Sequence, residues 1–475
     1  MKRYTACLLV MLLLASCGEG SAQPAETTAA ETTAAPVETS ILDELGAKDF
    51  AGRTFTILDA NDYPATHINM PGEEMTGDLI NDALIERDAK IESLYNCKID
   101  YVQITDAANG TNALRTSVLA GENIYNLCIS TVKGGRLATL ATEGILANLC
   151  DMPYLSLESN WWSRLIYEQC TIDGKLYFTS GDISSAVYRA PGCVFLNSSL
   201  LADYKIDTDF YQMVRDGKWT VDALYAVGKD ADRDLNDDGM LHASDDFFGL
   251  IHQTNQLTST MLLGGSGVFV CKNDGSGLTI SMDDTRMADI VEKLQGIVRL
   301  VVFEKQNDIF EKTFIEDRAI SLIHCVGTAM TTLREMNSDF MILPLPKYDA
   351  AQENYYSLIN GYCDCFVGIP VNADAEFTGF IAEAMARESH IGIRPKVYEL
   401  TLKGKSARDE GSSEMIDYIF NSLYIDHLEI NNFGGLAAAL GNVVLRGQPL
   451  ASTVASYQEA ANSAISDFTE AWTQK

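Results

Sequence analysis

The segment Asp234–Asp245, which reads DLNDDGMLHASD, spaces its oxygen-bearing groups as a twelve-residue calcium loop does. The donors at positions 1, 3, 5, 7 (a backbone carbonyl) and 12 are Asp234, Asn236, Asp238, Met240 and Asp245. Gly239 at position 6 permits the sharp turn, and Leu241 at position 8 supplies the apolar side chain that such loops turn inward. The sequence therefore predicts a structural calcium site, and the alternative is a solvated acidic turn. Because no second copy occurs, a paired dockerin-like anchor is excluded.

The thiols and imidazoles predict neither a zinc site nor a hydrolase. No C-x-x-C, H-E-x-x-H or G-x-S-x-G occurs, and the six histidines are scattered. Most of the eleven cysteines, such as Cys128 and Cys193, stand in apolar strand-like runs, where cysteine packs as a small hydrophobe. Cys363 and Cys365 flank Asp364, so a metal or redox role is a weaker alternative at that point.

Alternating strands and helices must position any further site. Apolar spacing predicts strands over 54–58, 98–102 and 126–130, and helices over 78–94, 112–120 and 136–143. This alternation indicates a parallel sheet covered by helices, whose ligands bind beyond the carboxyl ends of the strands. The polar residues that follow the first and third strands are therefore expected to contact a neutral polar ligand. They are Asp59, Asn61, Tyr63, Ser130 and Thr131.

Composition excludes several classes of partner. The 475 residues suffice for more than one domain, and no apolar run after the N-terminal segment is long enough to span a bilayer. A formal net charge of -31 leaves no basic surface for nucleic acid or for an anionic membrane. Neither a G-x-G-x-x-G nor a P-loop motif is present, so a nucleotide site of those types is not supported.

The N-terminus has the features of an export signal. Lys2 and Arg3 precede a short apolar stretch, so residues 1–16 are predicted to be a signal peptide. The run Leu-Ala-Ser-Cys that ends at Cys17 resembles the lipobox of bacterial lipoproteins, which implies a lipid on Cys17; the alternative is an ordinary cleavage site. Residues 17–41, rich in Ala, Thr, Glu and Ser, are expected to form a disordered linker.

Several segments, taken in order, resemble a known family. They are AGRTFTIL, GDLINDALIERDAKIESLYNCKIDY, IDGKLYFTSGDIS, CVFLNSSLL, DFMILPLPKYDAAQENYY and CDCFVGIPVNADAEFTGFIAEAMA. Along nearly the whole mature chain they resemble the extracellular solute-binding proteins of ABC importers, of the sugar-binding family 1 type that is maltose-binding-protein-like. The resemblance implies an α/β, periplasmic-binding-protein-like type II fold, with two α/β lobes, a hinge and an interlobe ligand cleft. Lobe I would comprise 42–182 plus 368–396, and lobe II 183–367 plus 397–475 with the calcium-type loop.

The same resemblance implies the function. A lipid-anchored protein on the extracellular face of the membrane, expected to be a monomer, would capture a small polar solute by lobe closure and deliver it to an ABC transporter permease. The solute would be a mono- or oligosaccharide, and no enzymatic activity is expected. Alternatives are a surface polysaccharide-degrading lipoprotein and a ligand receptor for a sensor system.

Aromatic and acidic residues near the expected first crossing complete the candidate ligand contacts: Trp162, Asp182, Tyr188 and Trp219. One ring of the Trp161–Trp162 pair is expected to face the cleft. Trp219 precedes Thr220, which is predicted to cap a helix that begins at Val221, so the alternative for Trp219 is to pack that helix onto its lobe.

Lipid attachment can be tested by cell fractionation. We expect the full-length protein to leave cells with detergent and not with buffer, and Cys17→Ala to shift it to the buffer fraction, because the lipid is its only predicted membrane anchor. Recovery of most wild-type protein in the buffer wash would contradict the anchor.

Overall fold

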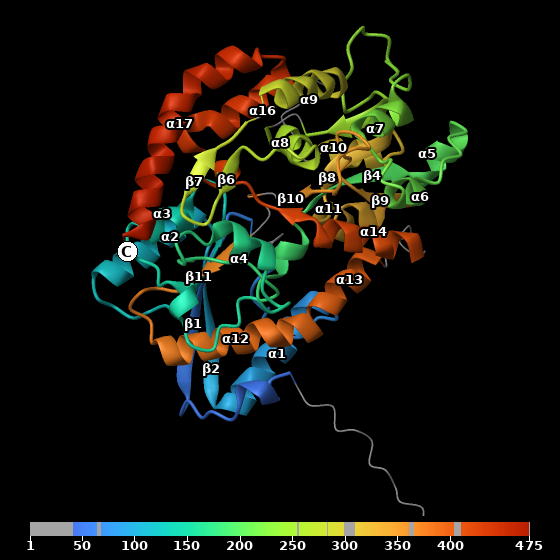
Figure 1. Cartoon of the computed structure of the whole chain (residues 1–475). Coiled ribbons are helices and arrows are strands. Elements are labelled where there is room, and N and C mark those ends of the chain that lie inside the picture. Colours follow the sequence, from blue (N-terminus) through green and yellow to red (C-terminus); the bar gives the residue numbers. More distant parts are fainter. Residues whose placement is uncertain are drawn as a thin grey trace, which may run out of the picture. The chain divides into compact units, whose positions relative to one another are not determined.

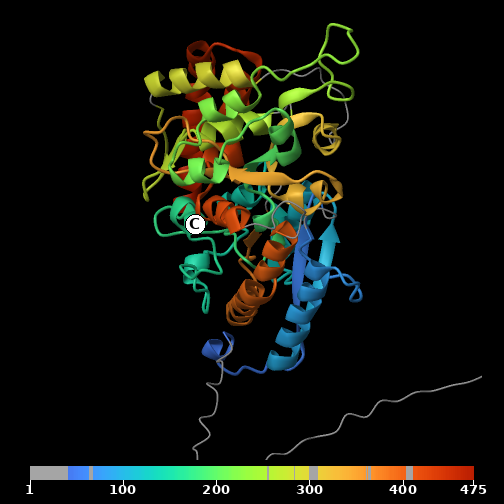
Figure 2. The same ribbon diagram turned by 90° about the vertical axis from the view of Figure 1, so that its right-hand side faces the viewer.

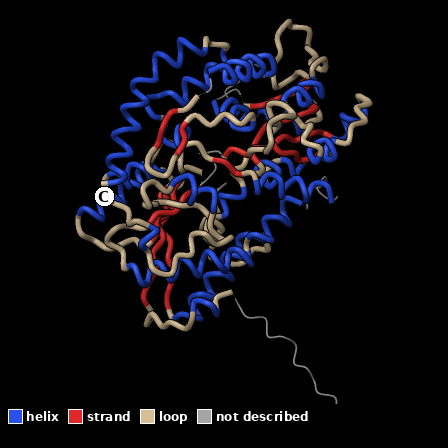
Figure 3. The backbone as a smooth tube through the Cα atoms, viewed as in Figure 1, coloured by secondary structure: helices blue, strands red, loops and turns tan. Residues whose placement is uncertain are grey.

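The computed structural model describes residues 41–63, 68–253, 256–282, 284–298, 309–359, 361, 365–402 and 410–474. The predicted signal peptide, Cys17 and the linker before residue 41 lie outside the described residues, as do Cys363 and Asp364. Residues Ile41–Lys475 form one unit of mixed helices and strands (Figures 1 and 3). Within the described part, no helix combines the length and the apolar character needed to cross a bilayer.

The strands are β1 (Arg53–Ala60), β2 (Cys97–Ile104), β3 (Leu127–Thr131), β4 (Gly192–Asn197), β5 (Phe248–His252), β6 (Cys271–Asn273), β7 (Leu278–Ile280), β8 (Ala319–Cys325), β9 (Phe340–Pro344), β10 (Ser357–Leu358), β11 (Cys365–Gly368) and β12 (Leu423–Tyr424). The helices are α1 (Leu79–Tyr95), α2 (Ala107–Leu119), α3 (Arg136–Thr142), α4 (Arg164–Cys170), α5 (Ser198–Asp203), α6 (Phe210–Arg215), α7 (Val221–Gly228), α8 (Gln256–Gly265), α9 (Asp284–Ile297), α10 (Ile309–Ile315), α11 (Gly327–Met330), α12 (Ala375–Gly392), α13 (Arg394–Leu402), α14 (Glu410–Asn421), α15 (His427–Asn431), α16 (Leu436–Arg446) and α17 (Leu450–Thr473).

The first sheet confirms the predicted parallel arrangement. Its order is β11-β3-β1-β2, with β1 parallel to both β2 and β3. Helix α1 begins where expected, because the Asp78 side chain accepts hydrogen bonds from the backbone N–H groups of Ile80 and Asn81. Strand β11, which comes from far along the chain, pairs antiparallel with β3.

A glycine fixes helix α2 against the end of β1. A Cβ atom at Gly110 would lie 2.4 Å from the Cβ of Ala60, so only glycine permits this close approach. The approach holds the residues that follow β1 beside the start of α2, where the Asp62 carboxylate accepts a hydrogen bond from the N–H of Ala107 (2.9 Å).

The second sheet has the order β5-β8-β4-β9, in which only β5 and β8 run parallel. The predicted cap of α7 is confirmed, since the Thr220 hydroxyl accepts from the N–H of Ala223 (3.3 Å). Strand β5 follows the calcium-type loop in the chain.

Two crossing segments join the sheets, and the first contains a short 3-10 helix at Ser185–Tyr188. We call 179–191 the first crossing and 359–367 the second, of which residues 360 and 362–364 are not described. They pair antiparallel at both ends, through bridges Thr179–Val367 and Pro191–Ile359. Helices α12 and α13 make a third connection alongside α1 (Figures 1 and 2). The expected lobe boundaries stay predictions. The boundary expected between residues 367 and 368 falls within β11, and the whole of β11 belongs to the first sheet.

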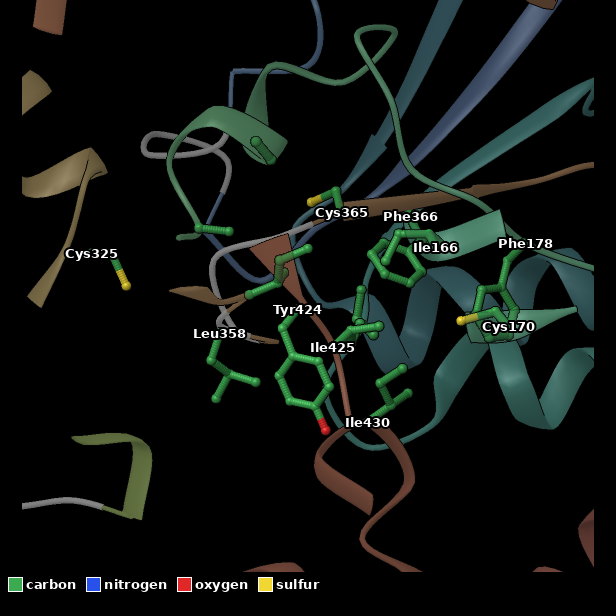
Figure 4. Close-up of a cluster of buried hydrophobic side chains, with 14 of the residues drawn as sticks. Ile166, Cys170, Phe178, Cys325, Leu358, Cys365, Phe366, Tyr424, Ile425 and Ile430 are labelled. Carbon is green, nitrogen blue, oxygen red and sulfur yellow. The ribbon is translucent and has the colours of Figure 1, made fainter. Parts of the chain in front are cut away.

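Buried apolar side chains continue across the crossings. Figure 4 shows Phe178, which precedes the first crossing, and Phe366 of the second crossing near Ile166 of α4, with Tyr424 and Ile425 from the C-terminal part of the chain. The cysteine prediction is confirmed for Cys128 and Cys193, which are free thiols in the core.

Candidate functional site

Strand ends from both sheets contact the crossing segments. At the end of β1, the Asn69 amide donates to Asp59 Oδ1 (3.2 Å), and the Ser184 hydroxyl of the first crossing donates to Asn69 Oδ1 (2.8 Å). Beyond β3, the N–H of Lys133 donates to the carbonyl of Gly361 in the second crossing (2.9 Å). Carboxyl ends of parallel strands thus meet the hinge, as the topology predicts.

The second sheet contributes its strand ends to the same place. Beyond β8, the N–H of Val326 donates to the carbonyl of Pro191 (2.9 Å), and that of Gly327 to the carbonyl of Arg189 (3.0 Å). We call this region, built from 59–63, 130–136, 184–191, 326–328 and Gly361, the interlobe junction.

Paired charges and hydroxyls line the first-sheet side of the interlobe junction. The Asp62 carboxylate lies 3.0 Å from the Arg136 guanidinium and accepts from the Thr131 hydroxyl (3.2 Å). Arg136 also donates to Thr131 Oγ1 (3.0 Å), and Lys133 Nζ lies 3.3 Å from Glu429. Thr131 is fully buried, and the half-buried charged groups around it offer donors and acceptors with little net charge, which suits a neutral polar ligand.

Asp59 is a fully buried carboxylate, and burial raises its pKa. The amides of Asn69 and Gln103 donate to its two oxygens (3.2 and 3.1 Å) and offset part of that effect. Because both oxygens have protein donors, Asp59 orders the loop after β1. Tyr63, in contrast, is 48% exposed, and its N–H donates to the Asn61 side chain.

Asp182 and Tyr188 lie together but contact the third connection. The Tyr188 hydroxyl donates to Asp182 Oδ1, and the other oxygen lies 2.5 Å from His390 Nδ1 at the end of α12. Arg394 lies 3.9 Å away. The geometry ties the first crossing to α12 and α13.

The tryptophan candidates lie in the core. Trp161 and Trp162 donate to the two oxygens of the buried Glu383 carboxylate (2.9 and 2.8 Å). Trp219 has no exposed surface and donates to the carbonyl of Pro344 (2.8 Å). In this conformation the rings of Trp162 and Trp219 are buried in the protein core. Their role as ligand contacts stays a prediction.

The structure brings together three polar residues that the sequence analysis missed. His324 at the end of β8 lies between Thr328, whose hydroxyl contacts Nδ1, and Glu311, 3.0 Å from Nε2. Burial lowers the pKa of His324, but contacts with Cys325 and Glu311 outweigh it and raise the pKa to about 10. The spacing of His324 and Thr328, four residues apart at a strand-to-helix turn, could have indicated their contact from the sequence. The contact with Glu311 could not be predicted this way, because Glu311 comes from another helix.

The calcium-type loop is held by contacts among its own residues. The N–H of Gly239 donates to Asp234 Oδ2 (2.7 Å), and the Asn236 amide lies within hydrogen-bond distance of Asp238 and Asp245. Asp234 Oδ1 is buried and has no hydrogen-bond partner among the described residues. Across the described part of the chain, no three His, Cys, Asp or Glu side chains are grouped to hold a metal ion.

The described architecture is the periplasmic-binding-protein-like fold of substrate-binding proteins, as the sequence predicted. A cyclo/maltodextrin-binding protein complexed with maltotetraose matches with a TM-score of 0.55 and 13% identity, over 88% of this chain and 97% of that one. The galacto-N-biose/lacto-N-biose I-binding protein of the Bifidobacterium longum ABC transporter matches with a TM-score of 0.54 and 12% identity, over 89% and 99%.

A Thermotoga lettingae solute-binding protein bound with α-D-tagatose matches with a TM-score of 0.51 and 14% identity, over 89% of this chain and all of that one. No protein-family model matches the chain, and the curated proteins contain no match.

The buried His324–Glu311 pair predicts that the stability of the protein depends on pH. Because the pKa of His324 is higher in the folded chain than its unfolded value near 6.5, its stabilisation is complete below that pH and is lost as pH rises through about 10. We expect His324→Gln to lower the free energy of unfolding by about 3 kcal/mol at pH 6.5, the range for a broken buried pair, and by less above pH 10. Urea titrations at both values measure this, and an equal loss at both would contradict it.

Proposed function

We propose that the chain is an extracellular binding protein that captures a carbohydrate between its lobes and delivers it to an ABC transporter permease. The observation that carries the proposal is the interlobe junction, where strand ends from both sheets meet two crossing segments. The fold around it is shared with proteins whose structures hold maltotetraose, lacto-N-biose and tagatose.

The chemistry of the interlobe junction supports a neutral hydroxylated solute. Arg136 and Lys133 offer donors, while Asp62 and Glu429 offer acceptors, and each charge has a partner of opposite sign. The buried Thr131 hydroxyl bridges Asp62 and Arg136 and holds that pair in place. A charged solute would leave one sign uncompensated, whereas hydroxyl groups can both donate and accept. Because an unpaired buried donor or acceptor costs about 1 to 3 kcal/mol, a matched set of hydroxyls would give specificity.

Closure would couple capture to transport. A ligand that contacts both lobes favours the closed arrangement by its differential affinity, and the crossing segments absorb the change in backbone angles. We propose that the permease binds this closed form. Lipid on Cys17 would keep a monomeric chain near the permease, with the linker as a tether.

The rival proposal of a polysaccharide-degrading enzyme has less support. Among the described residues, His324 lies between a hydroxyl and a carboxylate, and its raised pKa keeps it protonated at neutral pH, so it cannot accept a proton from Thr328. Saturable binding of glycans without new reducing ends would support a binding protein, and turnover would refute it. A receptor that reports to a sensor system would also bind without turnover. Deletion of the permease that the chain is proposed to serve distinguishes the two: a transport protein predicts loss of growth on the bound sugar, and a sensor does not.

Binding at the interlobe junction can be tested with paired variants. We expect calorimetry to detect maltotriose, lacto-N-biose or tagatose but not dipeptides. Lys133→Met should weaken binding about tenfold or more, because a lost hydrogen bond to a charged group costs about 1 to 3 kcal/mol. Thr131→Val should weaken it as well, because it removes the hydroxyl that bridges Asp62 and Arg136. Lys98→Met, on an exposed pair with Glu92, is the control. Equal losses in all three variants would reject this location, and binding of dipeptides alone would reject a carbohydrate.

We also propose that the calcium-type loop binds calcium as a structural ion. The turn made by Gly239 around Asp234 and the unpartnered Asp234 Oδ1 support a cation there. The ligands would be Asp234, Asn236, Asp238, the Met240 carbonyl and Asp245. The ion would neutralise the clustered carboxylates and would have no part in solute capture.

Calcium at about a hundredfold excess over its Kd should stabilise the folded chain by about 2.7 kcal/mol. Chelation should therefore lower the melting temperature, and Asp238→Ala should abolish the response. Asp237→Asn is the control, because residue 237 is not a predicted ligand and asparagine tolerates its φ of 58°. Identical melting of the wild type in calcium and in chelator would show that the loop is only an acidic turn.

A further inference from the structure

A second hollow lies apart from the interlobe junction. It has a volume of about 300 Å³ and is lined by residues of α4, β6, the segment before β10, and the chain from β12 into α15. It shares no residue with the interlobe junction. Sites for small molecules begin at roughly this volume, so the hollow suits a molecule with a single ring.

Aromatic rings form one wall of the hollow. Phe269 packs edge-to-face on Tyr356, with ring centres 4.7 Å apart, and lies 4.2 Å from the ring of Tyr424. All three rings line the hollow, and Phe269 and Tyr356 are only partly buried by the protein. Such a wall offers apolar contact to the C–H groups of a ligand.

His427 provides a polar group that the protein leaves unsatisfied. It lines the hollow and is only 2% exposed. Its Nε2 lies 2.8 Å from the carbonyl of Gln169, which can only accept, so Nε2 carries the proton and Nδ1 is an acceptor. Nδ1 is buried and has no hydrogen-bond partner among the described residues. Burial also lowers the pKa of His427, which keeps the ring neutral.

The opposite side of the hollow is fixed by amides. Asn273 donates to the carbonyls of Gln169 and Thr171 (2.8 and 2.7 Å), and the N–H of Ile425 donates to Gln169 Oε1 (3.4 Å). These bonds hold α4 against β6 and the chain that follows β12. Glu168 and Lys272, of opposite charge, stand exposed at the edge, so the lining carries no net charge that would select an ion.

We propose that this hollow is a second binding site, for a neutral, hydroxylated, single-ring molecule of monosaccharide size. The aromatic wall would contact one face of the ring, and a hydroxyl group would donate to His427 Nδ1. The site shares no lining residue with the interlobe junction, and it does not rest on the function proposed for that junction.

The test uses the mature chain with D-glucose and myo-inositol as probes, measured by saturation-transfer NMR and calorimetry. The background is a double variant, Thr131→Val with Lys133→Met, which removes contacts at the interlobe junction. We expect one of the probes to bind this background with unchanged affinity. Loss of binding in the background would place the probe at the interlobe junction and overturn the proposal.

Two further variants address the hollow itself. Leu423→Trp, which adds bulk to a lining residue, should weaken binding at least tenfold, and His427→Phe, which keeps a ring but removes the acceptor, should weaken it several-fold. Leu119→Trp, on an exposed residue of α2, is the control for added bulk. Circular dichroism identifies any variant that fails to fold, in which case the other one decides. Binding that neither folded variant weakens, or absence of binding by both probes at millimolar concentration, would overturn the proposal.

Discussion

The two backbone hydrogen bonds between Thr179 and Val367 are the constraint on which the other features depend. Each residue donates its N–H to the other's carbonyl (3.0 and 2.8 Å), which joins the crossing segments where they leave the first sheet. The Pro191–Ile359 bridge repeats the pairing where they reach the second. Two segments that are paired at both ends cannot separate there, so the strand ends of both sheets stay directed at one junction. Any capture of solute there relies on this pairing.

Local patterns were sufficient to predict much of the fold. The apolar spacing around Ile57 and Ile91 gave the first strand and helix, and Thr220 marked the start of α7, because caps and periodicity depend on residues a few positions apart. The place of β11 beside β3, and of β4 between β8 and β9, could not be predicted this way. These pairings join segments separated by long stretches of chain and leave no periodic trace in either partner.

The candidate site shows the same difference between what local sequence patterns predict and what they do not. The topological rule for parallel strands was enough to select Asn61 and Thr131, which do lie where the strands meet the hinge. It could not show that Trp161 and Trp162 share Glu383, a residue more than two hundred positions away, or that this leaves Trp162 buried and Trp161 partly buried. Tryptophan was weighed as a sugar contact from its chemistry alone, whereas its partner decides which surface it presents.

Glu383 also indicates which elements move as one body. It is fully buried on α12 and accepts from both indoles and from Arg387 (2.9 Å), so its charge is compensated in place. These bonds fix the Trp161–Trp162 pair to α12, and the Asp182–His390 pair fixes the beginning of the first crossing to the end of the same helix. Helix α12 must therefore move with the first sheet. Closure then requires backbone changes after Asp182 in the first crossing and after His390 at the start of α13. Residues that precede these two positions keep their contacts with α12 and the first sheet.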